Sequence, residues 1–199
     1  MLEAPAESLV ARHAVALLAL LFAALAFSPL IFLRYDFHDS WAFLFILNAA
    51  RVYNFAIGCL ETHEHSYLIG RPLVPAAICA MTAFGPVVDL LWVPKLQAFA
   101  ALLGAGGILA AELRRAGAGA AVASLCVLSL LFLPGTLLMV AHMAANPIAL
   151  GVLAATIAGY LWVRRLRRSA QSGAARAGWI ALVLALLVVA MALYQIVAV

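Results

Sequence analysis

The sequence has few charged residues and few cysteines, and both shortages limit what the protein can be. Aspartate, glutamate, lysine and arginine make up 10% of the 199 residues, whereas 68% are hydrophobic. A water-soluble domain cannot cover so much apolar surface with so few polar groups. The three cysteines, Cys59, Cys79 and Cys126, lack CxxC spacing, so they predict neither a disulfide framework nor a zinc site. Pairing of Cys59 with Cys79 outside the cytoplasm stays open.

The apolar residues form long runs instead of alternating with polar ones, and the mean hydropathy is +1.13. Runs of about 20 apolar residues match the thickness of a bilayer as helices. We therefore predict an all-α integral membrane protein with a single membrane domain over residues 1–199 and about five transmembrane helices. We read the first apolar run as an uncleaved span and not as a signal peptide. The expected spans are 12–33, 87–113, 118–140, 142–163 and 177–199.

Two of the expected spans carry small or helix-breaking residues at their centres. The run Gly104-Ala-Gly-Gly107 is small enough to let another helix approach closely. Pro134-Gly135 is expected to break the span over 118–140.

The arginines predict how the chain is oriented. Arg114-Arg115 and the cluster over 164–176 hold seven arginines between them, and the positive-inside rule places both on the cytoplasmic side. The N-terminus is then cytoplasmic, while residues 34 to about 90, the 134–146 turn and the C-terminus face outward. We expect a bacterial inner (plasma) membrane protein. The net charge of +4 reports this topology and not nucleic-acid binding.

The first outward loop, residues 34–86, is expected to hold helices that lie in the membrane interface. In the run 41–58, Asn48, Arg51 and Asn54 recur every three residues, which makes a slanting polar stripe on a helix. A buried helix whose polar face packs on other spans explains the stripe equally well. The run 72–84 is too short to cross and ends at Gly85-Pro86, so it predicts a second interfacial or re-entrant helix.

Four of the eight acidic residues and three of the five histidines also fall in this loop. Carboxylates at the outer surface could act as a general base, bind a metal or stay solvated, and the loop histidines and glutamates could grip a divalent metal only on an extended segment. A polar or substrate-contact loop is the alternative. An arginine at headgroup depth could hold a lipid phosphate, or simply snorkel to the headgroups. The residues concerned are Asp36, Asp39, Glu61, His63, Glu64, His65 and Arg71.

The second outward turn carries His142 and Asn146. A lone histidine near a helix end is more often structural than catalytic. Asn146 precedes Pro147, and this pair is a plausible start for the next helix because proline suits the first helical position.

Taken in order, these segments resemble the N-terminal half of the GT-C glycosyltransferases, in the branch of the protein mannosyltransferases and the lipid A aminoarabinose transferase. The resemblance covers most of the chain, although each motif is degenerate. After the first span, that branch has an outer acidic motif with an aromatic residue and an Ala-Arg pair, then a basic-Pro motif leading to Phe-Gly and a span that ends in a basic pair. The matching residues are His38-Asp39-Ser40-Trp41, Ala50-Arg51, Arg71-Pro72-Leu73, Phe84-Gly85 and Arg114-Arg115.

The resemblance implies inverting transfer of a sugar from a polyprenyl-phosphate donor at the outer face. Asp39, with Asp36 three residues upstream, would be the catalytic carboxylate, and Arg71 would hold the leaving phosphate. Asn146 stands where the family has a second outer carboxylate. The residues expected to contact substrate are Arg51, Arg71, His38, Glu64, His65 and Asn146.

Three functions remain open on the sequence. The first is a GT-C-like transferase or a subunit of one, because the five expected spans are fewer than that family usually has. The second is a non-catalytic subunit that packs its small-residue spans, through Gly104, Gly106 and Gly107, against other membrane subunits. The third is a metal-handling membrane protein that uses His63 and His65 with Glu61. In each case membrane lipids are the surrounding partners.

Overall fold

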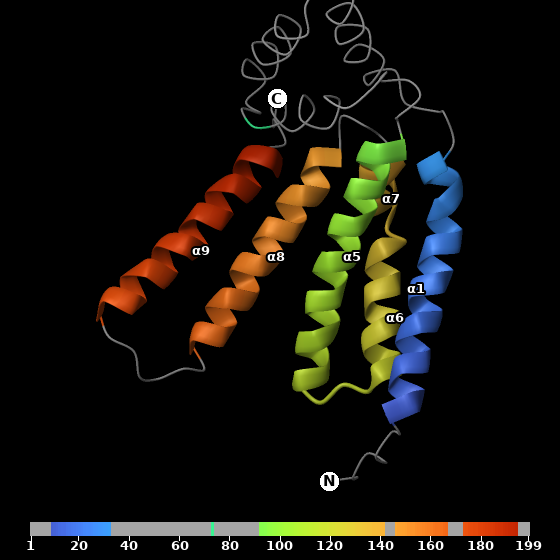
Figure 1. The fold of residues 1–199 in the computed structure, drawn as a ribbon, viewed down its shortest axis with the longest axis horizontal. Helices are drawn as coiled ribbons and strands as arrows, with labels where there is room; N and C mark the ends of the chain where they lie inside the picture. Colours follow the sequence, from blue (N-terminus) through green and yellow to red (C-terminus); the bar gives the residue numbers. More distant parts are fainter. Residues whose placement is uncertain (1–8, 33–72, 74–91, 142–145, 167–172, 195–199) are drawn as a thin grey trace, which may run out of the picture.

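The structure is a computed structural model that describes residues 9–32, 73, 92–141, 146–166 and 173–194. Within these ranges every regular element is an α-helix, as the apolar runs predict (Figure 1). The helices are α1 (Leu9–Phe32), α5 (Trp92–Arg115), α6 (Ala120–Leu131), α7 (Pro134–Ala141), α8 (Asn146–Leu166) and α9 (Gly173–Tyr194).

The helices have the length and composition that a membrane requires. Four of them, α1, α5, α8 and α9, are each long and apolar enough to cross alone. Helices α6 and α7 pass the same test together, as one segment bent by 63° at the break between them. The prediction of an all-α membrane protein with about five spans is therefore confirmed. The interfacial helices expected over 41–58 and 72–84 lie outside the described residues.

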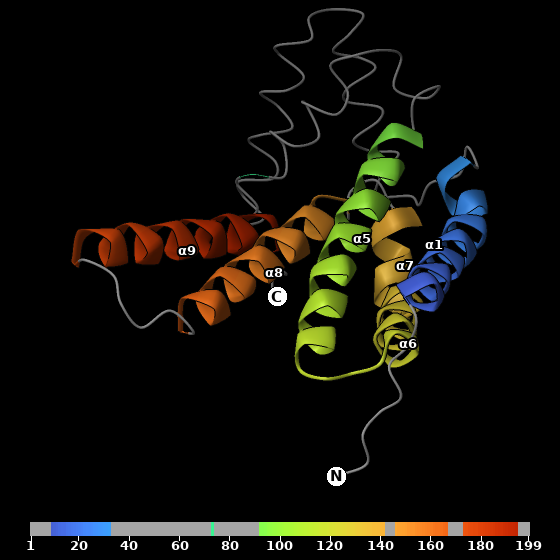
Figure 2. The ribbon, with the colours of Figure 1, turned by 60° about the horizontal axis from the view of Figure 1, so that its bottom comes forward.

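Successive spans, with α6 and α7 taken together as one, run in opposite directions, so their ends gather into two groups (Figure 1). We call one group the Lys95 end: α1 and α7 finish there, α5 and α8 begin there, and α9 finishes there. We call the other the arginine end, where α5 and α8 finish at Arg115 and Leu166 and where α6 and α9 begin. Helix α9 lies beside α8 at one edge of the bundle and α1 lies at the opposite edge (Figures 1 and 2).

Aromatic rings in the buried core of the bundle join α1, α5 and the α6–α7 break. Phe27 stacks on Phe99 with ring centroids 4.9 Å apart, and it meets Phe132 at 5.7 Å. Around these rings lie the buried side chains of Ala98, Val140 and Ala149. Offset and tilted ring pairs of this kind add to packing beyond the area they cover.

The glycines of α5 allow the close helix approach that the sequence predicts. A Cβ atom added at Gly106 would lie 2.6 Å from a methyl carbon of Val127 on α6, so only glycine fits there without a shift. A Cβ at Gly104 would touch Leu153 of α8 at 3.4 Å. At Gly107 the same atom would meet open space. Two of the three glycines therefore serve contacts inside the chain.

Helices α5 and α6 are joined by a tight turn over residues 116–119. Helix α5 ends in a Schellman motif, in which the Ala118 amide donates to the Leu113 carbonyl at 3.0 Å and the Gly117 amide to the Arg114 carbonyl at 3.1 Å. Gly117 has φ 97°, in the left-handed region that glycine adopts without steric cost.

Two prolines interrupt the membrane-spanning helices, and a hydroxyl group lies at each interruption. Proline has no N–H, so Pro29 leaves the Leu25 carbonyl without its usual helical donor and Pro134 does the same to the Leu130 carbonyl. The Ser28 hydroxyl donates to the Leu25 carbonyl at 2.8 Å. The Thr136 hydroxyl donates to the Leu130 carbonyl at 2.9 Å. In hydrocarbon, where water is absent, such bonds keep the interrupted helices from exposing bare carbonyls.

Candidate functional site

Nearly all the site residues that the sequence predicts lie outside the described part of the chain. The exception is Asn146, whose backbone is the first residue of α8; the predicted helix start at Asn146-Pro147 is thus confirmed. The predictions for the others stay predictions. They concern His38, Asp36, Asp39, Arg51, Glu61, His63, Glu64, His65, Arg71 and His142.

The described residues hold no group of three or more histidine, cysteine, aspartate or glutamate side chains that could bind a metal. Cys126 is an exposed free cysteine on α6.

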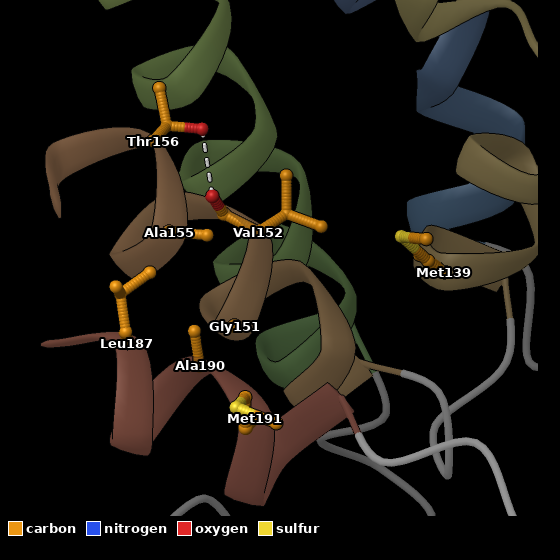
Figure 3. Close-up of a pocket in the computed structure, with 8 residues that line it drawn as sticks. All are labelled: Met139, Gly151, Val152, Ala155, Thr156, Leu187, Ala190 and Met191. Atoms are coloured by element: carbon orange, nitrogen blue, oxygen red, sulfur yellow. Dashed lines mark hydrogen bonds between the residues drawn. The ribbon is translucent and has the colours of Figure 1, made fainter. Parts of the chain in front are cut away.

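An apolar groove of about 510 Å³ lies between α7, α8 and α9 (Figure 3). The residues that line its centre are small: Gly151 and Ala155 on α8 and Ala190 on α9. Two methionines border it, Met139 on α7 and Met191 on α9. Methionine is flexible and polarisable, so it adapts to apolar ligands of irregular shape. We call this cavity the α8–α9 groove.

The groove holds one hydroxyl among its lining side chains, that of Thr156. This hydroxyl donates to the Val152 carbonyl one turn earlier at 2.8 Å, as Figure 3 shows. None of the lining residues carries a charge. The groove can therefore take a hydrocarbon chain but offers nothing to bind an ion.

A second cavity of about 250 Å³ lies at the α6–α7 break. Its lining includes Gly106 of α5, Leu130 and Leu133 at the break, and Thr136 of α7. It shares Val152 and Thr156 with the α8–α9 groove, so this part of α8 borders both cavities. The bend of 63° is what places Thr136 beside α8 and α5.

Lys95 is the one charged side chain that is buried among the described residues. It lies in the first turn of α5 at 1% exposure, about one turn before the buried residues Ala98 and Phe99. An ammonium group at such a position is costly unless other groups stabilise it, and it marks a functional region more often than a structural one. Lys95 also stands at the end of the bundle where α1 stops and α5 starts, so the segment 33–91, which contains most of the predicted site residues, connects the two helices at this end.

A cluster of charged and aromatic side chains lies at the arginine end, between α5 and α8. The guanidinium carbons of Arg115 and Arg164 are 5.7 Å and 5.1 Å from the ring centre of Tyr160. Arg115 also forms an ion pair with Glu112 on its own helix. A cation over an aromatic ring contributes about 0.5–1 kcal/mol at an exposed position, so Tyr160 holds two cations in place.

These features could be found from the sequence only in part. The groove is built from glycine, alanine and methionine, which look like ordinary span residues until two helices are placed side by side. The sequence shows Lys95 only as a charge near the start of the apolar run 87–113. The contact of Tyr160 with two arginines depends on the register of α5 against α8, which the sequence leaves open.

The fold and the cavities define a class: a helical membrane protein with an apolar groove between spans and a buried lysine at one end. The chain matches no protein-family model, and no curated protein sequence or solved structure is significantly similar to it.

Proposed function

We propose that the protein is a GT-C-like membrane glycosyltransferase, or a subunit of one, that takes its sugar from a polyprenyl-phosphate donor. The observation that carries the proposal is the α8–α9 groove, which is apolar, uncharged and bordered by adaptable methionines. Its volume of about 510 Å³ lies in the range of about 300–1,000 Å³ that is typical of small-molecule sites. We assign it to part of the polyprenyl chain.

The Lys95 end supports the same assignment. A polyprenyl phosphate that lies in the groove has its phosphate beyond the hydrocarbon, at one end of the helices. Lys95 provides a positive charge at that end, and the segment that holds Arg71 and Asp39 attaches there. The donor phosphate would be held by Arg71 through bidentate hydrogen bonds and stabilised at longer range by the ammonium group.

The proposed reaction is a single displacement at the sugar's anomeric carbon. The Asp39 carboxylate accepts the proton of the acceptor hydroxyl as the new C–O bond forms. The bond to the phosphate oxygen breaks, and polyprenyl phosphate leaves with the electron pair. A single base contributes about 10²–10⁴-fold to such a rate, and positioning of both substrates supplies much of the remainder.

The proposal includes an orientation in the bacterial inner membrane, with the N-terminus and the arginine end in the cytoplasm. A reporter fused at Gly117 or Ser172 should then be cytoplasmic, and one fused at Thr62 should be extracytoplasmic. A cytoplasmic reporter at Thr62 would remove Asp39 from the outer face and contradict the mechanism.

The groove can be tested with a pair of matched substitutions. Ala155 is exposed into the groove, whereas Ala185 is exposed on α9 outside it. Ala155→Phe should fill the groove and weaken binding of undecaprenyl phosphate to the purified protein at least tenfold, while Ala185→Phe should change it less than twofold. Equal binding by both variants would show that the groove does not take the polyprenyl chain.

The chemistry is tested separately, at Asp39 and Arg71. Asp39→Asn removes a proton acceptor with little change in volume, so it should abolish transfer while donor binding persists. Arg71→Ala should weaken donor binding, and Arg71→Lys should restore only part of it, because an ammonium cannot grip phosphate bidentately. Transfer that is unchanged in Asp39→Asn would favour a non-catalytic subunit. Gly104 and Gly106 contact α8 and α6 of the same chain, so these glycines do not favour that alternative.

A further inference from the structure

At the arginine end, two arginines from different helices lie against one tyrosine ring, and this arrangement is not needed for the proposed transferase. Arg115 ends α5 and Arg164 lies in the last turn of α8, while Tyr160 stands one turn earlier on α8. Both guanidinium groups lie within cation–π distance of the Tyr160 ring. Because these helices pack together, the two cations are held close to each other.

We infer that Arg115 and Arg164 form a binding site for the phosphate of an anionic phospholipid. The inference stands independently of the proposed function. Two like charges repel, and among the described side chains Glu112 pairs with Arg115 on the same helix. One carboxylate balances one of the two guanidinium charges, so the pair keeps a net positive charge that a phosphate can neutralise.

The position of the pair selects a lipid phosphate. Arg115 is the last residue of the crossing segment Trp92–Arg115, and Arg164 is one residue before the end of Pro147–Arg165. The ends of such segments lie at headgroup depth. Basic groups between helices at this depth are the usual sites of anionic headgroups.

The side chains are also suited to bind phosphate. The Arg115 side chain is 42% exposed and Arg164 is exposed, so both guanidinium groups are accessible from the membrane surface. A guanidinium presents a planar fork of donors that matches two phosphate oxygens. Both guanidinium groups contact the Tyr160 ring, which restricts their positions. They therefore lose less conformational entropy on binding a phosphate than isolated surface arginines would.

The experiment measures binding of dioleoyl phosphatidylglycerol to the full-length protein in neutral detergent micelles, by native mass spectrometry. Dioleoyl phosphatidylcholine is the neutral comparison lipid, and inorganic phosphate is added as a competitor. Arg164→Gln and Arg115→Gln should each weaken binding of the anionic lipid by about fivefold to tenfold. Arg164→Lys should recover part of this loss.

The matched control is Arg176→Gln, which removes the same charge from an exposed arginine of α9 at the same end of the bundle. It should change binding by less than twofold. Tyr160→Leu should weaken binding although both arginines remain, whereas Tyr160→Phe, which keeps the ring, should weaken it less.

Three results would overturn the inference: a loss in Arg176→Gln as large as in Arg164→Gln, equal retention of the neutral lipid, or binding of inorganic phosphate in place of the lipid. Size-exclusion profiles check that each variant is folded. If Arg115→Gln fails to fold, Arg164→Gln and its lysine variant still decide the result.

Discussion

Pro29 and Pro134 each remove a backbone donor from a membrane-spanning segment, yet α1 continues through Pro29 while the chain bends by 63° at Pro134. In both places a hydroxyl donates to the carbonyl that the proline leaves without a helical donor. The difference is where the hydroxyl comes from. Ser28 belongs to the same turn as its carbonyl, whereas Thr136 reaches back from the next helix across the bend.

The comparison shows that a proline does not by itself decide whether a membrane helix bends. With Ser28, the carbonyl at Leu25 is satisfied inside a continuous helix, so nothing forces the chain to break there. At Pro134 the direction of α7 is set by packing, because Val140 at its far end has 0% exposure in the core. The Thr136 bond fits that direction and stabilises it. The following predictions test this distinction, each by the free energy of unfolding in mixed micelles.

The largest effect is expected for Pro134→Ala, which should lower the stability by about 2 kcal/mol, because an N–H group without an acceptor is costly in hydrocarbon. The new N–H group of residue 134 is unfavourable whether the bend is kept or lost. If the bend of 63° is kept, the N–H has no helical acceptor. If the helix straightens so that it can bond to Leu130, α7 swings away and Val140 leaves the core.

Pro29→Ala is the matched control for Pro134→Ala, because its new N–H finds the Leu25 carbonyl in a helix that already has the right course. It should raise the stability by about 1 kcal/mol, part of the roughly 3 kcal/mol that proline costs in a helix interior. Changes of the same sign at the two prolines would contradict the distinction drawn between them.

A smaller loss, about 1 kcal/mol, is expected for Ser28→Ala, because the Leu25 carbonyl then has neither its helical N–H nor the hydroxyl. The sharper measurement is a double-mutant cycle with Pro29→Ala. Once residue 29 has an N–H, the serine should matter little, so the two changes should be strongly non-additive. Additive losses would mean that Ser28 acts by some other contact.

The smallest effect is expected for Thr136→Val, which should cost about 0.6 kcal/mol, the average for a hydrogen bond that a polar side chain makes in a membrane protein. The Leu130 carbonyl keeps the Leu133 amide as a donor at 3.3 Å after the hydroxyl is lost. Thr156→Val is the control, since its hydroxyl bonds to a carbonyl within an unbroken helix. A cost at Thr136 greater than that at Ser28 would reverse the expected order.

Much of the membrane fold follows from the sequence. The five crossing segments agree with the predicted spans to within a few residues, and the break at Pro134-Gly135 was expected. The close approach of helices at the α5 glycines was expected too, because small side chains remove the steric barrier between two spans. What could not be predicted is which carbonyl each hydroxyl would reach, since this depends on the direction of the helix after the proline.

The candidate sites divide in a similar way. The predicted carboxylates, histidines and arginines of the first loop lie outside the described residues, so their roles stay predictions. The α8–α9 groove and the Tyr160 cluster could not be predicted from the sequence. Each forms only when two helices pack in a particular register. Alanine, glycine and tyrosine are ordinary in a span, and they become a groove or a cation site only after packing.

The turn at Gly117 bears on how the protein is made. Because four residues join α5 to α6, and because Gly106 lets Val127 approach closely, these two helices can pair as soon as both have left the ribosome. We expect such a hairpin to leave the translocon as one unit, because its contacts are local and close quickly. Helix α1 is synthesised before α5 and α6. Its aromatic stack can therefore form only after Phe99 and Phe132 have also entered the membrane. A ribosome stalled after α6 would already display the hairpin contact, and crosslinking between α5 and α6 at positions other than Gly106 would detect it.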